Sequence, residues 1–351
     1  MEEPLPPPDN APQQRHAPRP LPLFLELVRQ CSRQDPDLAR RALAGLDAYE
    51  SAPRARPRPG RPAIARVGGA ALRDHGGDGG DGAPLVLVPS LINPPHVLDL
   101  DEGTSLAAAL QASGRHVLLV DWGPAPARSG LGVAGHVEEL LLPLLAALGE
   151  PPALVGYCLG GTMAIAAAGL VPVARVATLA APWHFARYPD DSRAALGRLW
   201  RQSEAAAARF GALPIEVLQA GFWALDPERT VRKFAEFSEL DPAGDKARRF
   251  IALEDWANEG EPLPLPAARE LFETLYRDDM PGREQWRVGG KPTAERPPVP
   301  ALHLVAGEDR IVPPATAPGG EQVAIASGHV GMVVGRARAQ LQQVLLKFLA
   351  D

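Results

Sequence analysis

The sequence Val155-Gly156-Tyr157-Cys158-Leu159-Gly160-Gly161 decides how this chain folds. An apolar run at 153–155 precedes it and an alanine-rich run at 162–170 follows it, so we predict a strand, a tight turn and a helix. Glycine at 156 and 160 lets the backbones of the strand and the helix approach closely. The pattern is that of a nucleophile elbow in which cysteine occupies the position of the nucleophile.

The position of Cys158 at a helix N-terminus suits nucleophilic chemistry. The partial positive charge there favours the thiolate, which is the reactive form of cysteine. The elbow therefore predicts acyl transfer through a thioester on Cys158. Two backbone N–H groups should stabilise the negatively charged oxygen of the intermediate. We expect one from Leu159 and the other from the loop after strand 84–88, at Ser90 or Leu91.

Apolar runs that indicate buried strands alternate with helical runs along the chain. The expected strands are 84–88, 116–121, 153–157, 173–180, 300–306 and 322–326, preceded by a strand or hairpin at 63–74; the expected helices include 106–113, 133–148 and 341–349. We expect a kink at Pro143, because proline cannot donate a helical hydrogen bond. The alternation predicts an α/β fold with a mostly parallel, doubly wound sheet.

Composition divides the chain further. Residues 183–299 are mostly helical in pattern and contain five of the six tryptophans, so we predict a helical cap inserted over the active site. The other predicted segments are a disordered, proline-rich tail at 1–22, helices and a linker at 23–62, and the two parts of the α/β core at 63–182 and 300–351.

Two residues after the cap complete the candidate site. Asp309 follows strand 300–306, with Glu308 beside it as the reserve acid, and His329 lies between glycines after the last strand. Nucleophile, acid and histidine in this chain order are typical of the α/β-hydrolase fold. Imidazole can accept and return a proton near neutral pH, and the carboxylate orients it. We predict a catalytic triad of Cys158, His329 and Asp309.

Composition excludes several function classes. The net charge of −6 argues against a nucleic-acid binder. The sequence contains no run of 18 apolar residues, so we predict no transmembrane segment. Residues 1–22 lack the apolar stretch of a signal peptide. The two cysteines and eight histidines show no disulfide or metal spacing. We expect a cytoplasmic enzyme without metal or cofactor.

These motifs resemble those of polyhydroxyalkanoate (PHA) synthases, which are cysteine-dependent relatives of lipases within the α/β-hydrolase fold. The matching residues follow the family's order over roughly residues 85–335. They are Gly156-Tyr157-Cys158-Leu159-Gly160-Gly161-Thr162, Val88-Pro89-Ser90-Leu91-Ile92-Asn93 with Leu98-Asp99-Leu100, Val120-Asp121-Trp122-Gly123, Ala180-Ala181-Pro182-Trp183, Asp309 with Ile311-Val312-Pro313, and Gly328-His329-Val330-Gly331.

The resemblance implies a PHA polymerase-like acyltransferase. Cys158, activated by His329, would attack a (R)-3-hydroxyacyl-CoA thioester, release CoA and extend a polyester, with CoA thioester as substrate rather than cofactor. It also implies an oligomer, a second synthase subunit and association with the PHA granule surface.

The chain departs from the family pattern in three places. Asn93 is followed by Pro94-Pro95-His96 instead of a basic residue and two tyrosines, Arg310 replaces the histidine that often follows the aspartate, and His329 comes only 20 positions after Asp309. A cysteine-dependent thioesterase or esterase, in which water takes the acyl group, is a second hypothesis. A non-catalytic, granule-associated relative is the third, and the altered segments 93–96 and 310–321 suggest it.

Overall fold

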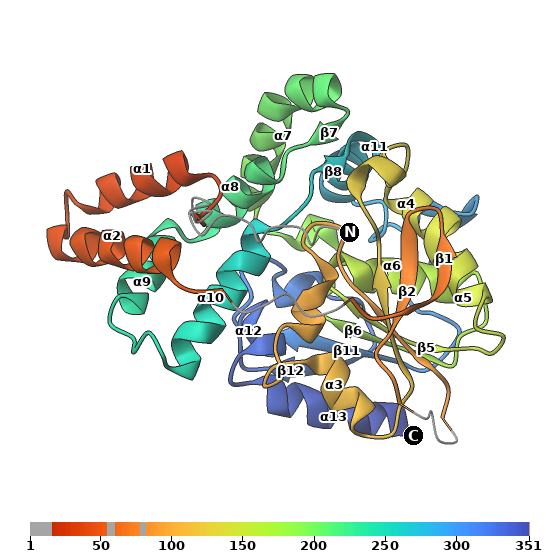
Figure 1. Cartoon of the computed structure of the whole chain (residues 1–351). Coiled ribbons are helices and arrows are strands. Elements are labelled where there is room, and N and C mark those ends of the chain that lie inside the picture. The colour runs from red at the N-terminus through yellow and green to blue at the C-terminus, as the bar shows by residue number, and fades with distance from the viewer. Residues whose placement is uncertain (1–15, 55–59, 78–81, 351) are drawn as a thin grey trace, which may run out of the picture. The chain divides into compact units, whose positions relative to one another are not determined.

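The computed structural model describes residues 16–54, 60–77 and 82–350. They form two compact units (Figure 1): an α/β unit of Pro57–Leu225 with Glu259–Asp351, and an N-terminal helical unit that adds Asp226–Asn258 to the first helices. Residues 1–15 of the predicted tail lie outside the described residues, and the first helix begins at Leu21, within the predicted tail. The bounds of the five predicted segments stay predictions.

The α/β unit is built on an eight-stranded sheet in the order β1-β2-β4-β3-β5-β6-β11-β12. The predicted hairpin forms β1 and β2, which pair antiparallel; β2 also pairs antiparallel with β4, and all later neighbours are parallel. The bounds are β1 Ala63–Val67, β2 Ala70–Asp74, β3 Leu85–Val88, β4 Val117–Asp121, β5 Ala153–Tyr157, β6 Arg175–Leu179, β11 Ala301–Ala306 and β12 Glu321–Ile325. The predicted, mostly parallel sheet is thus present.

Helices cover both faces of this sheet (Figure 1). Helices α3 (Leu106–Gln111) and α13 (Arg338–Ala350) pack against each other on one face, while α6 (Leu159–Ala168) and η3 (His136–Leu141) pack together on the other. Every residue of α6 is buried. Its glycines and alanines allow that close approach to the strands. Among the described residues, no helix is both long and apolar enough to cross a membrane.

The remaining elements of the α/β unit are short, apart from α7 and α8. They are η1 Pro95–Asp99, η2 Ala125–Arg128, α4 Val133–Gly135, α5 Leu142–Ala146, η4 Phe185–Arg187, α7 Asp190–Phe210, β7 Ala212–Leu213, α8 Ile215–Leu225, β8 Leu263–Pro264, α11 Leu265–Arg269, η5 Glu270–Arg277, β9 Arg287–Val288, β10 Lys291–Pro292, η6 Pro314–Thr316 and α12 Gly331–Val334.

The irregularity expected at Pro143 takes the form of a π-helix. Segment η3 has the wider π geometry, and the N–H of Leu142 donates to the carbonyl of Val137, five residues back. Pro143 then lies at the start of α5. The wide π turn leaves room for the ring of Pro143. The N–H that proline lacks is at the position where the helix changes from π to α hydrogen bonding, so no regular helical bond is lost there.

The N-terminal helical unit pairs segments that are far apart in sequence. It comprises α1 (Leu21–Cys31), α2 (Pro36–Ser51), α9 (Pro227–Phe237) and α10 (Asp245–Asn258). Asp35 caps α2 by accepting the N–H of Leu38 at 2.8 Å, and Pro36 is the first residue of the helix. Helices α2 and α9 touch at Gly45, where a Cβ atom would lie 1.8 Å from the carbonyl oxygen of Phe234.

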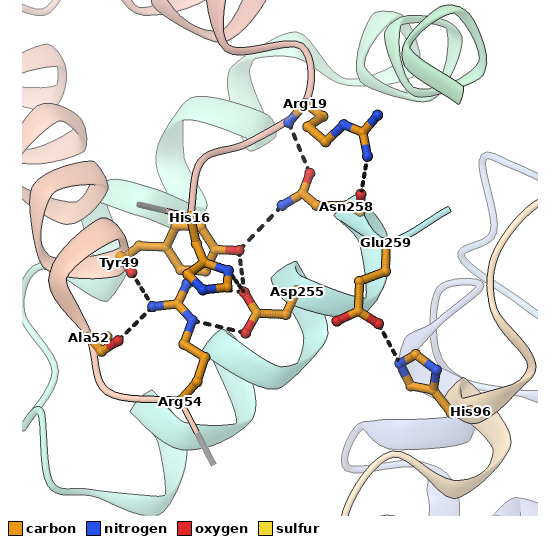
Figure 2. A network of polar contacts seen from close by, with 9 residues as sticks. All are labelled: His16, Arg19, Tyr49, Ala52, Arg54, His96, Asp255, Asn258 and Glu259. Atoms are coloured by element: carbon orange, nitrogen blue, oxygen red, sulfur yellow. Dashed lines mark hydrogen bonds and ion pairs between the residues drawn. The ribbon is translucent and has the colours of Figure 1, made fainter. Parts of the chain in front are cut away.

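A polar network holds the end of α2 to α10 (Figure 2). Asp255 accepts from the Tyr49 hydroxyl at 2.6 Å and from two nitrogens of Arg54 at 3.0 Å. Arg54 also donates to the carbonyls of Tyr49 and Ala52 and lies 4.5 Å from the Tyr49 ring centroid. Figure 2 also draws His96 beside Glu259, an ion pair of the α/β unit at 3.6 Å.

Arg54→Ala is expected to lower the free energy of unfolding of the N-terminal helical unit by about 2–3 kcal/mol, because it leaves the Asp255 carboxylate with only the more distant His16, at 3.9 Å, as an ion-pair partner. Both side chains of the pair are only 17% exposed. The matched control is Arg40→Ala, since Arg40 is 73% exposed and pairs with exposed Asp37; a change within about 0.5 kcal/mol is expected there. Equal losses in urea unfolding would contradict the structural role of the network.

Candidate active site

The elbow has the geometry that its sequence predicts. Strand β5 ends at Tyr157, α6 begins at Leu159, and Cys158 between them has φ 56° and ψ −131°. This is a strained conformation for a residue with a side chain. The N–H of Cys158 donates to Leu179 of the neighbouring strand at 2.9 Å, which holds the turn in place. Cys158 is a partly exposed residue without a disulfide partner.

Two glycines make this turn possible. A Cβ atom on Gly156 would lie 2.4 Å from the Cα of Gly161, and one on Gly160 would lie 2.2 Å from the carbonyl oxygen of Val88. Real Cβ atoms do not come so close to backbone atoms. The start of α6 therefore lies directly against the segment that leads to Ser90 and Leu91.

Gly160→Ala is expected to destabilise the protein by about 1–3 kcal/mol, because the added methyl group forces backbone apart. If Cys158 is the nucleophile that the sequence predicts, this variant should also slow acyl transfer on the order of 100-fold, since small shifts of a reacting atom are costly. The control is Gly169→Ala at the end of the same helix, where φ is −77° and the nearest atom to a Cβ is 3.5 Å away. Thermal unfolding that distinguishes the two variants only weakly would contradict this account of the turn.

The structure brings His329 and Asp309 together. Nδ1 of His329 lies 2.6 Å from Oδ2 of Asp309. The other carboxylate oxygen accepts the N–H groups of Ile311 and Val312 at 2.8 and 2.9 Å, so the acid is held on both sides. The Asp309 side chain is fully buried, whereas the reserve candidate Glu308 is exposed.

Cys158 lies close enough to His329 for its charge to act on the imidazole. Burial lowers the pKa of His329, but the charges of Cys158 and Asp309 and the hydrogen bond to Asp309 outweigh it and raise the pKa to about 10. The imidazole therefore favours its protonated form, with Nδ1 against the Asp309 carboxylate.

The short connection between the acid and the histidine does not separate them. Strands β11 and β12 are adjacent and parallel, with Leu302 opposite Glu321 and Ala306 opposite Ile325. Between them runs the single turn η6 in place of a crossover helix. Asp309 and His329 follow the carboxyl ends of these neighbouring strands, which is why they meet. The short connection between β11 and β12 thus still allows Asp309 and His329 to form a hydrogen bond.

The predicted oxyanion residues lie beside the elbow. Leu159 is the first residue of α6, and a Cβ on Gly160 would be 2.5 Å from the carbonyl oxygen of Pro89, next to Ser90. Trp122 fixes this loop by donating its indole N–H to Pro89 at 3.2 Å. The roles of Leu159, Ser90 and Leu91 as donors stay predictions.

Tyr157 supports the histidine, a contact that sequence reasoning did not anticipate. Its ring centroid lies 5.1 Å from that of His329, and its hydroxyl donates to the His329 carbonyl at 3.4 Å. Tyr157 precedes the nucleophile in the elbow, so its position in the motif was the available signal.

An apolar pocket is lined in part by the two residues that follow Asp309, Arg310 and Ile311. Its cavity volume is about 60 Å³, and it is lined by apolar side chains of α7, α8 and η5 together with Ile92 and Ile311. Ile311 follows Asp309 by two residues, and Ile92 follows the predicted oxyanion loop. Tyr188 and Tyr276 also line it, and their hydroxyl oxygens are 3.5 Å apart. Neither tyrosine was predicted, because they are distant in sequence and meet only in the folded chain.

Across residues 16–54, 60–77 and 82–350, no group of three or more His, Cys, Asp or Glu side chains is arranged to hold a metal ion.

Sequence comparison finds relatives among the poly(3-hydroxyalkanoate) polymerase subunits named PhaC. The subunit of Haloferax mediterranei is 28% identical over 275 residues, which are 72% of this chain and 55% of the relative. That of Allochromatium vinosum is 26% identical over 302 residues, 80% of this chain and 84% of the relative. The chain thus spans about half the length of the first and most of the second. No protein-family model matches it.

Among solved structures, an epoxide hydrolase of Bacillus megaterium matches with a TM-score of 0.53 and 14% identity, covering 82% of this chain and 99% of the hydrolase. At that identity the likeness concerns the fold alone, and it agrees with the sheet order and the elbow described above. The predicted fold and family resemblance are both confirmed. The chain is a homologue of the PhaC polymerase subunits, with the α/β-hydrolase fold.

Proposed function

We propose that this protein is a PHA synthase-like acyltransferase that uses Cys158 as its nucleophile and (R)-3-hydroxyacyl-CoA as its substrate. The observation that carries the proposal is the His329–Asp309 hydrogen bond close to Cys158, which is located at a strained elbow. The PhaC relatives support the polymerase class. A second subunit, an oligomer and a granule surface stay predictions.

In the first half-reaction the Cys158 thiolate attacks the thioester carbonyl carbon. The carbonyl oxygen becomes negatively charged, and the backbone N–H groups of Leu159 and the Ser90–Leu91 loop would stabilise it. Collapse of this intermediate breaks the bond to CoA sulfur. His329, protonated at neutral pH, gives its proton to the departing CoA thiolate, and the acyl group remains on Cys158 as a thioester.

In the second half-reaction the now neutral His329 accepts a proton from a hydroxyl group. The hydroxyl oxygen attacks the Cys158 thioester, an ester bond forms and the thiolate leaves. His329 returns to the protonated state beside it, with Asp309 stabilising the cation throughout. If water supplies the attacking oxygen instead, the product is the free acid and the enzyme is a thioesterase.

The test offers purified protein (R)-3-hydroxybutyryl-CoA and measures released CoA and ester-linked product together. The proposal predicts CoA release accompanied by oligomeric or polymeric ester. CoA release with only free 3-hydroxybutyrate would replace the synthase with a thioesterase. Absence of CoA release would leave the non-catalytic hypothesis.

A further inference from the structure

The apolar pocket next to Asp309 includes two tyrosines. Its lining is otherwise mainly aliphatic and aromatic, yet it includes Tyr188 and Tyr276, whose hydroxyl oxygens lie 3.5 Å apart. The other polar lining residues differ in exposure, since Ser192 is half-buried and Arg310 exposed, whereas Tyr188 is 4% exposed. Two hydroxyls in an apolar pocket require an explanation, because burying a poorly bonded hydroxyl is unfavourable.

The two hydroxyls satisfy each other poorly. Tyr276 donates to Tyr188 across 3.5 Å, at the long limit for a hydrogen bond, where 2.7–2.8 Å is usual between oxygens. Ring packing fixes this spacing. The Tyr276 ring is perpendicular to that of Phe185 and steeply inclined to that of Tyr188, both at 5.1 Å. The pair therefore presents a donor and an acceptor that a third hydroxyl group could use.

The two tyrosines also interact electrostatically with Cys158 and Asp309. Burial raises the pKa of Tyr276 to about 12, with further contributions from the charges of Cys158 and Asp309. Burial, the neighbouring Tyr276 and, to a smaller extent, the same two charges raise the pKa of Tyr188 well above its usual value. Both phenols therefore stay protonated and available as hydrogen-bond donors at neutral pH, close enough to the thiol for its charge to act on them.

We propose that the Tyr188–Tyr276 pair binds the 3-hydroxyl group of the acyl chain and so selects hydroxyacyl thioesters over unsubstituted ones. This inference rests on the proposed acylation of Cys158. The alkyl tail would enter the apolar part of the pocket. A cavity of about 60 Å³ is well below the ~150 Å³ that admits a benzene molecule. The substrate class is therefore a 3-hydroxyacyl group with a short tail.

The test compares (R)-3-hydroxybutyryl-CoA with butyryl-CoA, which differ only in the hydroxyl. Single-turnover CoA release is measured for wild type, Tyr188→Phe, Tyr276→Phe and the double variant. Wild type should prefer the hydroxyacyl thioester by roughly 10–100-fold. This is less than the roughly 10⁴-fold preference of enzymes whose polar groups are left unpaired by the analogue, because here the two tyrosines can bond each other when the substrate hydroxyl is missing. The double variant should lose most of that preference, because CoA release should become slower with (R)-3-hydroxybutyryl-CoA and stay unchanged with butyryl-CoA.

Tyr49→Phe in the N-terminal helical unit is the matched control and should keep the wild-type preference. Iodoacetamide labelling of Cys158 at the wild-type rate verifies that each Phe variant has an intact elbow. An unchanged preference in the double variant, or an equal loss with both thioesters, would overturn the inference. Failure of wild type to release CoA from either thioester would instead refute the proposed function.

Discussion

Cys158→Ala is expected to abolish CoA release, reducing its rate by roughly 10⁴-fold or more. Without the sulfur no acyl-enzyme forms, and neither His329 nor the oxyanion groups can replace a covalent intermediate. Removal of one methylene-linked thiol that is partly exposed should leave the fold unchanged. The measurement is loss of thioester absorbance with (R)-3-hydroxybutyryl-CoA.

The matched control is Cys31→Ala. Cys31 ends α1 in the N-terminal helical unit, is also partly exposed, and belongs to no part of the candidate site. Activity in this variant should equal that of wild type. Substantial thioester cleavage by Cys158→Ala would show that the elbow cysteine is not the nucleophile.

His329→Gln is expected to slow alkylation of Cys158 by iodoacetamide at pH 7 by roughly 10–30-fold, because an ordinary thiol is only a few per cent ionised there. The proposed mechanism makes His329 the group that activates the Cys158 sulfur, so removing the imidazole should lower the reactivity of this cysteine. The experiment uses a Cys31→Ala background, so that Cys158 alone is labelled. Catalysis should be lost together with the reactivity.

The stability that His329 contributes to the folded protein should fall as the pH rises. The pKa of His329 is raised from 6.5 to about 10 on folding. Its protonated form therefore contributes to stability fully below about pH 6.5, and that contribution is lost as the pH rises through about 10.

The control for the alkylation experiment is His116→Gln, which removes a partly exposed histidine paired with Asp74. It should leave the dependence of Cys158 alkylation on pH unchanged. Identical profiles for His329→Gln and wild type would contradict the Cys158–His329 pair.

Local patterns predicted the elbow and the sheet well. The strand 153–157 has the predicted bounds, and the alternation of apolar and helical runs predicted the parallel core. These features depend on residues adjacent in sequence, where glycine spacing and apolar runs leave few conformations open. Chain order also selected Asp309 and His329, because both follow neighbouring strands of the sheet.

Long-range pairings could not be read from local patterns. Nothing near Tyr188 indicates that it meets Tyr276, which is 88 residues away. The packing of α2 on α9 likewise depends on Gly45 and Phe234, which no short motif connects. Segment composition predicted a helical region at 183–299, but α9 and α10 of that region form a compact unit with α1 and α2. Such partners are chosen by side-chain fit across the folded chain.

The most direct measurement of the central claim is the mass of the acyl-enzyme. The protein is mixed with (R)-3-hydroxybutyryl-CoA, quenched in acid within one turnover and digested, and the peptide that contains Cys158 is weighed. The account predicts an increase equal to one or more hydroxybutyryl groups on Cys158, absent from Cys158→Ala. CoA release without acyl groups on this peptide, or with acyl groups on another residue, would contradict it.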